Sequence, residues 1–204
     1  MSYTLRFAII AVAALATACG TDSTLPEGMG SVRIQLTDAP FPFDSVATVD
    51  IHVVRIDARL LDTDSLSAAA NVDDNDVGGW ITLARPDKMF ELLALRGGKV
   101  ADLGVAEVPV GIYHGLRLIL DVSKSSITLK NGLTLTGTST PGVKFPSANR
   151  SGLKINADGG VVVTSEDPTI LVVDFDVGQS FVMRGNSIAQ NGLLFKPVLS
   201  ASVK

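Results

Sequence analysis

The sequence is poor in the residues that usually reveal a protein's chemistry. Its 204 residues include one cysteine, two histidines and one tryptophan. A single cysteine excludes a disulfide framework and a thiolate metal site within the chain. The sequence also contains no Gly-x-Ser-x-Gly nucleophile motif, no His-Glu-x-x-His zinc motif and no glycine-rich phosphate-binding motif. It therefore carries no recognised catalytic signature and predicts no cofactor.

Basic residues, aromatic residues and long apolar runs are scarce as well. The chain has 17 lysines and arginines against 21 acidic residues, a net charge of −4, whereas a nucleic-acid-binding domain needs a basic stripe. Aromatic residues make up 5% of the chain, a poor supply for a sugar-stacking surface. Beyond the N-terminus, no apolar run reaches the roughly 20 residues of a membrane-spanning helix. Neither a nucleic-acid partner nor a membrane-spanning segment is expected.

The first 18 residues are typical of a secretory signal. Arg6 supplies the positive charge of the N-terminal part, residues 7–16 are almost continuously apolar, and small residues at 16–18 precede Cys19. An apolar core of roughly 7–15 residues in this setting defines a signal peptide rather than a membrane span. We therefore predict that residues 1–18 are removed from the mature protein.

Two interpretations of Cys19 are open. In the first, an ordinary signal peptide is cleaved nearby, which leaves an unpaired thiol on an exported chain. In the second, the segment resembles the lipobox of bacterial lipoproteins, although Ala16 stands where leucine is commoner and Leu15 lies one residue earlier. The second is favoured, and it implies acyl chains such as palmitate on Cys19 and the lipid bilayer as a partner. By the same resemblance, Gly20 rather than aspartate favours the outer membrane in a host that has one.

The remaining chain divides into a linker and one domain. Residues 19–30 are rich in Ser, Thr, Pro and Gly, and they predict a flexible spacer. Residues 31–204 show short alternating runs separated by Gly, Pro and Asn turns, without an internal repeat or a clean helical pattern. We predict an all-β fold: a single antiparallel β-sandwich, prealbumin-like or immunoglobulin-like, with long surface loops.

The alternation of apolar residues locates the strands. The predicted strands are 31–37, 45–61, 80–83, 108–122, 127–130, 133–135, 160–164, 169–177, 180–184 and 193–203, the last interrupted by Pro197. Within 45–61 the apolar face changes phase, which predicts a bulge near residues 54–55. Asn131-Gly132 predicts a two-residue type I′ hairpin turn. Residues 87–95 predict either a short strand or a single helical turn.

In the predicted strand 108–122, strict alternation separates two sets of side chains. It places Ile112, His114 and Leu116 on one face and Tyr113 and Arg117 on the other. His114 is therefore expected to be a core or boundary histidine rather than a catalytic one. His52 also lies in a predicted strand. A Ser-His-Asp triad stays open, because the sequence alone does not give its geometry.

The order of several short motifs resembles a known family. These motifs are Thr-Asp-Ala-Pro at 37–40, Gly-Trp at 79–80, the apolar run 90–95, Val-Pro-Val-Gly-Ile-Tyr at 108–113 and Val-Asp-Phe-Asp at 173–176. Their order resembles a family of prokaryotic exported domains catalogued as domain of unknown function 4382, many of which are lipoproteins. The resemblance implies a β-sandwich and an envelope location. It implies no activity and no site residues.

An acidic run at 73–76 is the first candidate cation site. A calcium-binding loop needs acidic side chains at alternate positions and a glutamate at position 12. Depending on the register, Arg85 or Ala84 stands at position 12 here. A solvated loop over 62–79 is therefore the simpler interpretation.

Three aspartates form the second candidate site. Asp174 and Asp176 are two residues apart on a predicted strand, so they share a face. If Asp38 lay nearby, three carboxylates could hold a hard cation, or two could act as acid and base. The alternative is that Asp38 caps its own turn while the other two line a solvated face.

Trp80 and Tyr113 are the candidate sugar-stacking residues, although an aromatic residue at a strand start more often belongs to the core. Taken together, the sequence favours a membrane-anchored lipoprotein of the cell envelope. Its β-sandwich would be a non-catalytic binding or structural module, with an envelope protein or a glycan as the candidate partner. Two alternatives are kept. One is a carboxylate-based hydrolase or metal-dependent enzyme using Asp38, Asp174 and Asp176, and the other is a glycan-binding module.

Overall fold

The structure is a computed structural model, and it describes residues 26–38, 44–60, 80–145 and 152–204. Cys19, the predicted signal peptide and the acidic run 73–76 lie outside the described residues. The strands are β1 Met29–Asp38, β2 Val46–Leu60, β3 Trp80–Ala84, β4 Lys88–Glu91, β5 Ala101–Pro109, β6 Gly111–Leu120, β7 Ser126–Leu129, β8 Thr134–Leu135, β9 Val143–Lys144, β10 Leu153–Ile155, β11 Val161–Val163, β12 Thr169–Phe175, β13 Phe181–Met183, β14 Leu193–Phe195 and β15 Leu199–Val203. The helical elements are short: the 3₁₀ turn η2 (Leu92–Leu95), α1 (Val177–Ser180) and α2 (Ile188–Asn191).

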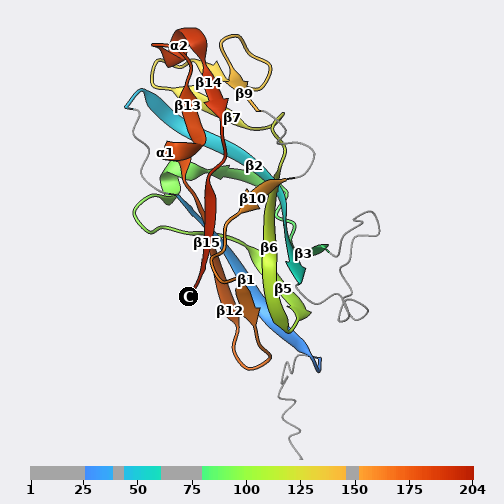
Figure 1. Cartoon of the computed structure of the whole chain (residues 1–204). Helices are drawn as coiled ribbons and strands as arrows, with labels where there is room; N and C mark the ends of the chain where they lie inside the picture. The colour runs from blue at the N-terminus through green and yellow to red at the C-terminus, as the bar shows by residue number, and fades with distance from the viewer. Residues whose placement is uncertain (1–25, 39–43, 61–79, 146–151) are drawn as a thin grey trace, which may run out of the picture.

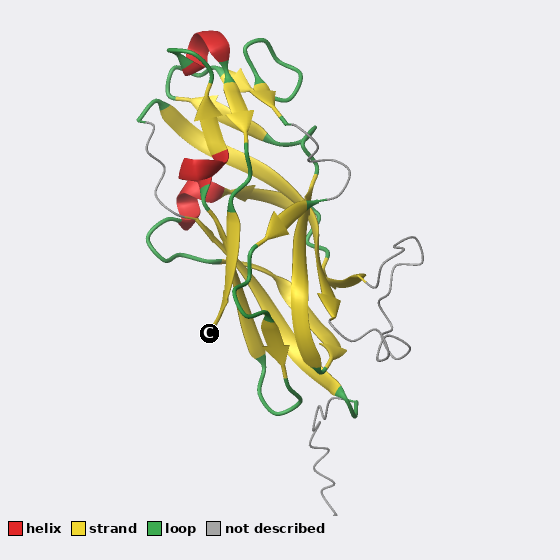
Figure 2. Cartoon of the chain, viewed as in Figure 1, coloured by secondary structure: helices red, strands yellow, loops and turns green. Residues whose placement is uncertain are grey.

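The strands form three sheets (Figures 1 and 2). Sheet A has the order β15-β12-β1-β5, and sheet B has the order β10-β6-β2-β7-β8 with β11 on β6 and with β3 and β4 on β2. Alternate side chains of sheets A and B form one buried core, in which Ile34, Ile56 and Leu118 are fully buried. The prediction of an all-β sandwich is confirmed.

The sequence predicted an antiparallel sandwich, whereas the structure also contains parallel strand pairs. β1 pairs with β12 in parallel, from Val32 opposite Thr169 to Asp38 opposite Phe175. A second parallel pair joins β14 to β9 in sheet C. Because β1 and β12 run the same way, their C-terminal ends meet at one edge of the sheet. This arrangement brings together residues that are far apart in the sequence.

The predicted bulge in β2 is confirmed. Val53 pairs with Leu120 and Arg55 pairs with Ile119, so Val54 is an extra residue on β2. One inserted residue reverses the alternation of the faces. The long strand can therefore keep an apolar face toward the core along its whole length.

A second bulge overturns the predicted faces of β6. Arg59 pairs with Gly115 while Leu60 pairs with Tyr113, which leaves His114 as an extra residue. Tyr113 consequently points into the core, and Ile112 and His114 are exposed. The prediction that His114 is a core or boundary residue is wrong, because strict alternation does not hold across a bulge.

The turn at Asn131-Gly132 also differs from the prediction. The Gly132 N–H donates to the Leu129 carbonyl over 2.9 Å, and the Leu129 N–H donates to the Leu133 carbonyl over 2.8 Å. Gly132 has a φ of 86°, and the only described non-glycine residue with positive φ is Asp87. A type I′ turn needs positive φ at both central residues. The loop is therefore a three-residue turn closed by a left-handed glycine.

Other predictions were partly right. Residues 87–95 form both a strand and a helical turn, β4 followed by η2, and Pro197 separates β14 from β15. The edge strand β5 was not predicted, because its alternation is weak around Gly104. Its pairing with β1 also changes register between Ile34 and Gln35.

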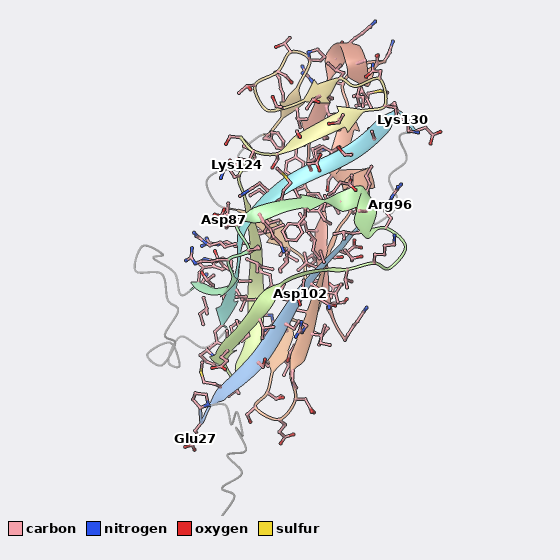
Figure 3. All side chains as sticks on the ribbon, turned by 180° about the vertical axis from the view of Figure 1, so that it is seen from behind. Glu27, Asp87, Arg96, Asp102, Lys124 and Lys130 are labelled. Atoms are coloured by element: carbon pink, nitrogen blue, oxygen red, sulfur yellow. The ribbon has the colours of Figure 1, made fainter. Side chains whose placement is uncertain are left out.

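The molecule is elongated, with two distinct ends (Figures 1 and 3). The lower end holds the start of β1 and the β5–β6 corner, and Glu27 marks it in Figure 3. The upper end holds sheet C (β13-β14-β9) and α2, and Lys130 of the β7–β8 hairpin marks it. Phe195 links sheet C to the sandwich, because its ring lies 5.0 Å from that of Phe181 and 6.2 Å from that of Phe175.

Candidate functional site

The three predicted carboxylates gather where β1 and β12 end. Asp38 is the last residue of β1, and Asp174 lies opposite Thr37 in the parallel register. Asp38 is 5% exposed, and its Oδ1 accepts a hydrogen bond from the Val177 N–H over 3.1 Å. Asp176 caps α1, with its Oδ1 accepting from the Gln179 N–H over 2.9 Å. Two of the three aspartates are therefore occupied with the first turn of α1.

Burial changes the acidity of two of these carboxyls. It raises the pKa of Asp38 to about 7, against a lowering by the Val177 N–H, and the nearby Asp174 raises this pKa further. Burial also raises the pKa of Asp174, with a smaller contribution from the charge of Asp176. Among the described residues, nothing donates a hydrogen bond to Asp38 Oδ2 or to Asp174 Oδ1. This environment favours the protonated acids.

The same geometry bears on the predicted metal site. No group of three or more acidic, histidine or cysteine side chains in the described part of the chain is placed to hold a metal ion. A hard cation needs six to eight oxygen ligands, whereas Asp38 and Asp176 already accept backbone N–H groups. The three aspartates thus lie near one another without forming a cation cage. In the parallel register Asp38 pairs with Phe175 and Asp174 pairs with Thr37, so Asp38 and Asp174 point to opposite faces of the sheet.

His52 has serine and aspartate neighbours, but they are not arranged as a triad. Its Nε2 lies 3.8 Å from Asp87 Oδ1. Ser125 contacts the backbone of His52 instead of the imidazole: its Oγ accepts from the His52 N–H over 3.0 Å and donates to the Asp121 carbonyl over 2.8 Å. A nucleophilic serine must bond to the imidazole itself. Ser125 therefore fixes a turn rather than forming a relay with His52.

Trp80 and Tyr113, the two candidate sugar-stacking residues, lie in different environments. Tyr113 is 1% exposed, and its hydroxyl donates to the Pro109 carbonyl over 2.7 Å, which ties the β5–β6 corner together. Burial raises the pKa of Tyr113 to about 12. Trp80 is half-buried, with the Arg117 guanidinium 4.2 Å from its ring centroid. The two rings do not form a shared stacking platform.

Arg117 belongs to a charged network on the outer face of sheet B. Asp57 is buried at its centre and accepts from Arg117 Nε over 2.9 Å, from Arg55 Nε over 3.0 Å and from Thr82 Oγ1 over 3.0 Å. A buried carboxylate with two guanidinium partners is compensated in charge and in hydrogen bonds. Through Arg117 the network also holds Trp80 against the sheet.

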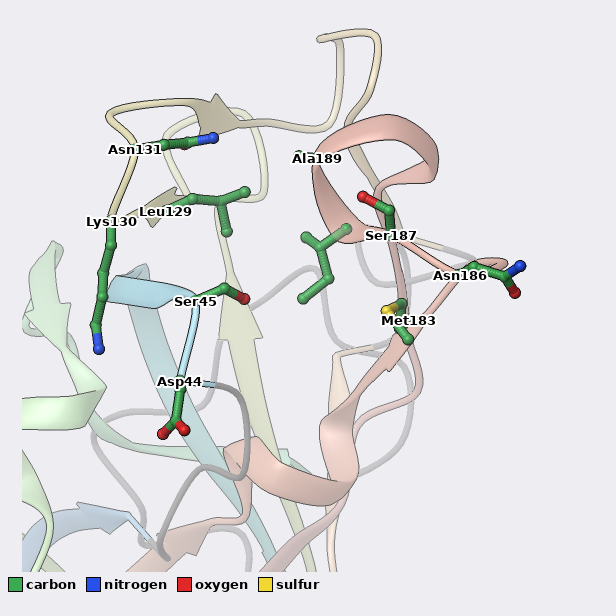
Figure 4. A pocket seen from close by; sticks show the side chains of 10 residues that line it. Asp44, Ser45, Leu129, Lys130, Asn131, Met183, Asn186, Ser187 and Ala189 are labelled. Carbon is green, nitrogen blue, oxygen red and sulfur yellow. The ribbon is translucent and has the colours of Figure 1, made fainter.

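The upper end of the molecule is hollowed between three segments (Figure 4). The pocket has a volume of about 490 Å³, and its lining comprises Asp44, Ser45, Leu129, Lys130, Asn131, Met183, Asn186, Ser187, Ile188 and Ala189. This volume lies within the range of small-molecule sites, roughly 300–1,000 Å³. The lining combines an apolar floor with amides, hydroxyls and one charge of each sign.

Local structure orients one polar group of this pocket, the amide of Asn131. Asn131 Oδ1 accepts from the Leu133 N–H over 3.0 Å, and the amide nitrogen points toward α2. Ser187 occupies the N-cap position of α2 without making a side-chain capping bond. Sequence reasoning noticed Asn131 only as a turn residue. The lining comes from segments around 44, 130 and 187, and no local pattern connects them.

A second hollow lies beside sheet C. Its volume is about 780 Å³, and it is lined by Val122, Ser123, Gly137, Thr138, Val143, Lys144, Phe145 and Leu194. Its single charged group is Lys144. It shares no lining residue with the pocket of Figure 4.

Comparisons with known proteins give one match. The sequence model of a family described as "Domain of unknown function (DUF4382)" matches residues 29–197. No curated protein and no solved structure matches the chain. In the described parts of the chain, no helix has the length and apolar content to cross a bilayer.

Proposed function

The chain belongs to the DUF4382 family, and we propose that it is a lipid-anchored envelope protein with a non-catalytic binding domain. Acylation of Cys19 holds the N-terminus at the bilayer, at the outer membrane where the host has one. The β-sandwich presents the pocket of Figure 4 to a ligand or partner in the envelope. The proposal rests above all on one observation. The pocket lies at the upper end, whereas β1, the first described strand after Cys19, starts at the lower end.

The chemistry of the pocket supports a small hydroxylated ligand. Amides such as Asn131 and Asn186 both donate and accept hydrogen bonds, as do the hydroxyls of Ser45 and Ser187. Sugars offer hydroxyl groups to such a rim and C–H faces to an apolar floor. The glycan-binding alternative is therefore better supported at this pocket than at Trp80 and Tyr113.

The environment of the three aspartates argues against the hydrolase alternative. A general acid has to reach a substrate, whereas Asp38 is buried and bonded to the backbone of α1. Neither of the two hollows is lined by Asp38, Asp174 or Asp176. The domain is accordingly proposed to bind without catalysing a reaction.

Two experiments test the two halves of this proposal. Metabolic labelling with a fatty acid should mark the wild-type chain, and Cys19→Ser should abolish the label and release the protein into the soluble fraction. Retained label in Cys19→Ser would refute the anchor.

Binding is tested separately by titration calorimetry with a panel of neutral and N-acetylated mono- and disaccharides. A sugar that binds the wild type should bind Asn131→Ala and Lys130→Ala at least several-fold more weakly. Lys144→Ala, in the second hollow, is the matched control. Absence of binding across the panel, or binding that is insensitive to Asn131→Ala and Lys130→Ala, would refute sugar recognition at this pocket.

A further inference from the structure

The lower end carries a cluster of aliphatic side chains that the proposed function does not use. Val110, Ile112 and Val162 are 37%, 41% and 53% exposed. Ile112 and Val162 are directly paired across β6 and β11, so their side chains share the outer face of sheet B. Val110 is two residues before Ile112, at the β5–β6 corner. Single exposed aliphatic residues are common on proteins, whereas these three gather at one strand corner, and we call Val110, Ile112 and Val162 the patch.

This patch lies where the chain coming from Cys19 joins the domain. The Val110 N–H donates to the Gly28 carbonyl over 2.9 Å, and Met29 pairs with Pro109. A Cβ atom on Gly30 would lie 2.3 Å from the Thr164 carbonyl oxygen, so the start of β1 also packs against the end of β11. The patch and the start of the domain therefore occupy the same end of the molecule.

The short linker keeps this end close to the membrane. Nine peptide units join Cys19 to Gly28, and a fully extended chain of this length spans at most about 30 Å. A flexible chain has an average end-to-end distance of only about 17 Å. The lower end is thus held at a high effective concentration near the lipid headgroups, and a weak contact becomes sufficient for docking.

We propose that Val110, Ile112 and Val162 dock onto the lipid bilayer and orient the domain with its upper end away from the membrane. This inference rests on the proposed acylation of Cys19. Aliphatic side chains gain free energy in the interfacial region because they leave water. The occupant of the patch is therefore the bilayer to which the chain is attached.

The charged groups around the patch affect how strongly the domain is attracted to or repelled by lipid headgroups. The lower end exposes the acids Glu27, Glu107, Glu166 and Asp167, while exposed His114 and Arg59 lie on the β6 side of the patch. These carboxylates are repelled by anionic headgroups within a Debye length, about 8 Å at physiological salt. We therefore assign the docking to burial of the aliphatic side chains, which a phosphatidylcholine bilayer tests without a net headgroup charge.

A site-specific fluorophore tests the docking on the full acylated chain. The chain has one cysteine, and acylation blocks its thiol, so Val162→Cys introduces the only thiol that a dye can label. Val182→Cys, on β13 at the upper end and 44% exposed, is the matched control. Both labelled proteins are reconstituted into phosphatidylcholine vesicles that contain lipids brominated near the headgroup.

The proposal predicts quenching of the dye at position 162 about twofold or more stronger than at position 182, since a docked side chain enters the interfacial layer. Adding Ile112→Ser or Val110→Ser to Val162→Cys should reduce that quenching, whereas adding Val182→Ser should not. Thermal melting checks that each variant is folded.

Equal quenching at both positions in protein that floats with the vesicles would overturn the docking alone. Protein that does not float would overturn the acyl anchor and the docking with it. Patch-dependent dimerisation without quenching would assign the patch to a second copy and overturn the proposal.

Discussion

The two ends of the molecule belong to the same sandwich but differ in shape: one is hollowed by a pocket, and the other is a strand corner. The upper end is hollowed, and its rim carries amides, hydroxyls and charges such as Asp44 and Lys130. The lower end exposes aliphatic side chains at Val110, Ile112 and Val162. Sheet C forms the upper end. At the lower end, the start of β1 packs closely against the end of β11, beside the β5–β6 corner. The proposed binding surface and the proposed docking surface therefore lie at opposite ends of the fold.

The largest expected effect concerns the aromatic cluster that holds the upper end on the sandwich. Phe195 is 1% exposed, and its ring contacts those of Phe145, Phe175 and Phe181. Phe195→Ala should lower the free energy of unfolding by about 3–5 kcal/mol, because it leaves a cavity in the core. Urea unfolding measures this loss.

Hydrogen exchange on the same variant sharpens the comparison between the ends. Amides of β13 and β14 should lose protection more than those of β1 and β5. Uniform loss of protection would show that the two ends do not differ in how they are held. A loss below about 1 kcal/mol would contradict the role of the aromatic cluster.

The second prediction concerns the junction between the two ends, at Asp38. The folded pKa is about 7 against an ordinary value of 3.8. The stabilisation from protonating Asp38 is therefore fully present below the ordinary value and is lost as the pH rises through 7. The raised pKa of Asp174 acts in the same direction. The wild-type free energy of unfolding should fall as the pH rises from 5 to 8.

Asp38→Asn should make the protein more stable at pH 8, by about 2–4 kcal/mol. The amide oxygen can still accept from the Val177 N–H, while the buried charge is gone. Urea unfolding at several pH values should show a shallower pH dependence for this variant. Asp102→Asn, which removes an exposed partner of Arg33, should leave the wild-type pH dependence in place. If the free energies of unfolding of Asp38→Asn and of the wild type changed with pH in parallel, the raised pKa of Asp38 would be refuted.

The third prediction tests the close packing of the lower end. A Cβ on Gly30 would meet the Thr164 carbonyl oxygen at 2.3 Å and Val163 Cγ1 at 2.5 Å. Gly30→Ala should therefore cost about 1–3 kcal/mol of stability through overpacking, and it should loosen β1 from β11. Gly137→Ala, whose Cβ would make only ordinary contacts, is the control. A melting temperature equal to that of the control would show that the lower end is not tightly packed.

The smallest expected effect belongs to the pocket rim. Lys130→Ala removes an exposed side chain at the upper end. Its effect on the free energy of unfolding should stay within about 0.5 kcal/mol, as is usual for surface substitutions. Chemical denaturation measures this directly. A much larger loss would mean that Lys130 serves the fold rather than a ligand.

The sequence predicted the strands better than their pairing. The bulge at Val54 is visible in the sequence because apolar residues on both sides of it change phase. The bulge at His114 is hidden, since Ile112, His114 and Leu116 alternate without interruption. The parallel pair β1–β12 leaves no local trace either, because pairing depends on segments that meet only in the folded chain.

The candidate sites likewise combine features that are visible in the local sequence with contacts between segments that are distant in the sequence. Asp38, Asp174 and Asp176 were identified as a group from their residue type, but the parallel register decides how near they lie. The hydrogen bond between the Val177 N–H and Asp38 depends on where Val177 lies in the folded chain, whereas Asp176 caps α1 locally. The pocket of Figure 4 was not predicted, because its lining comes from separate segments and contains no chemical motif.

The most direct test of the separation between the ends is hydrogen exchange on the acylated protein, with and without a phosphatidylcholine bilayer. On the bilayer, exposed amides of the β5–β6 corner and of the 164–168 loop should exchange more slowly, because the lower end is then covered. Amides around Lys130 and Ser187 should be unchanged. Slower exchange at the upper end, or no change at the lower end of membrane-bound protein, would contradict the account.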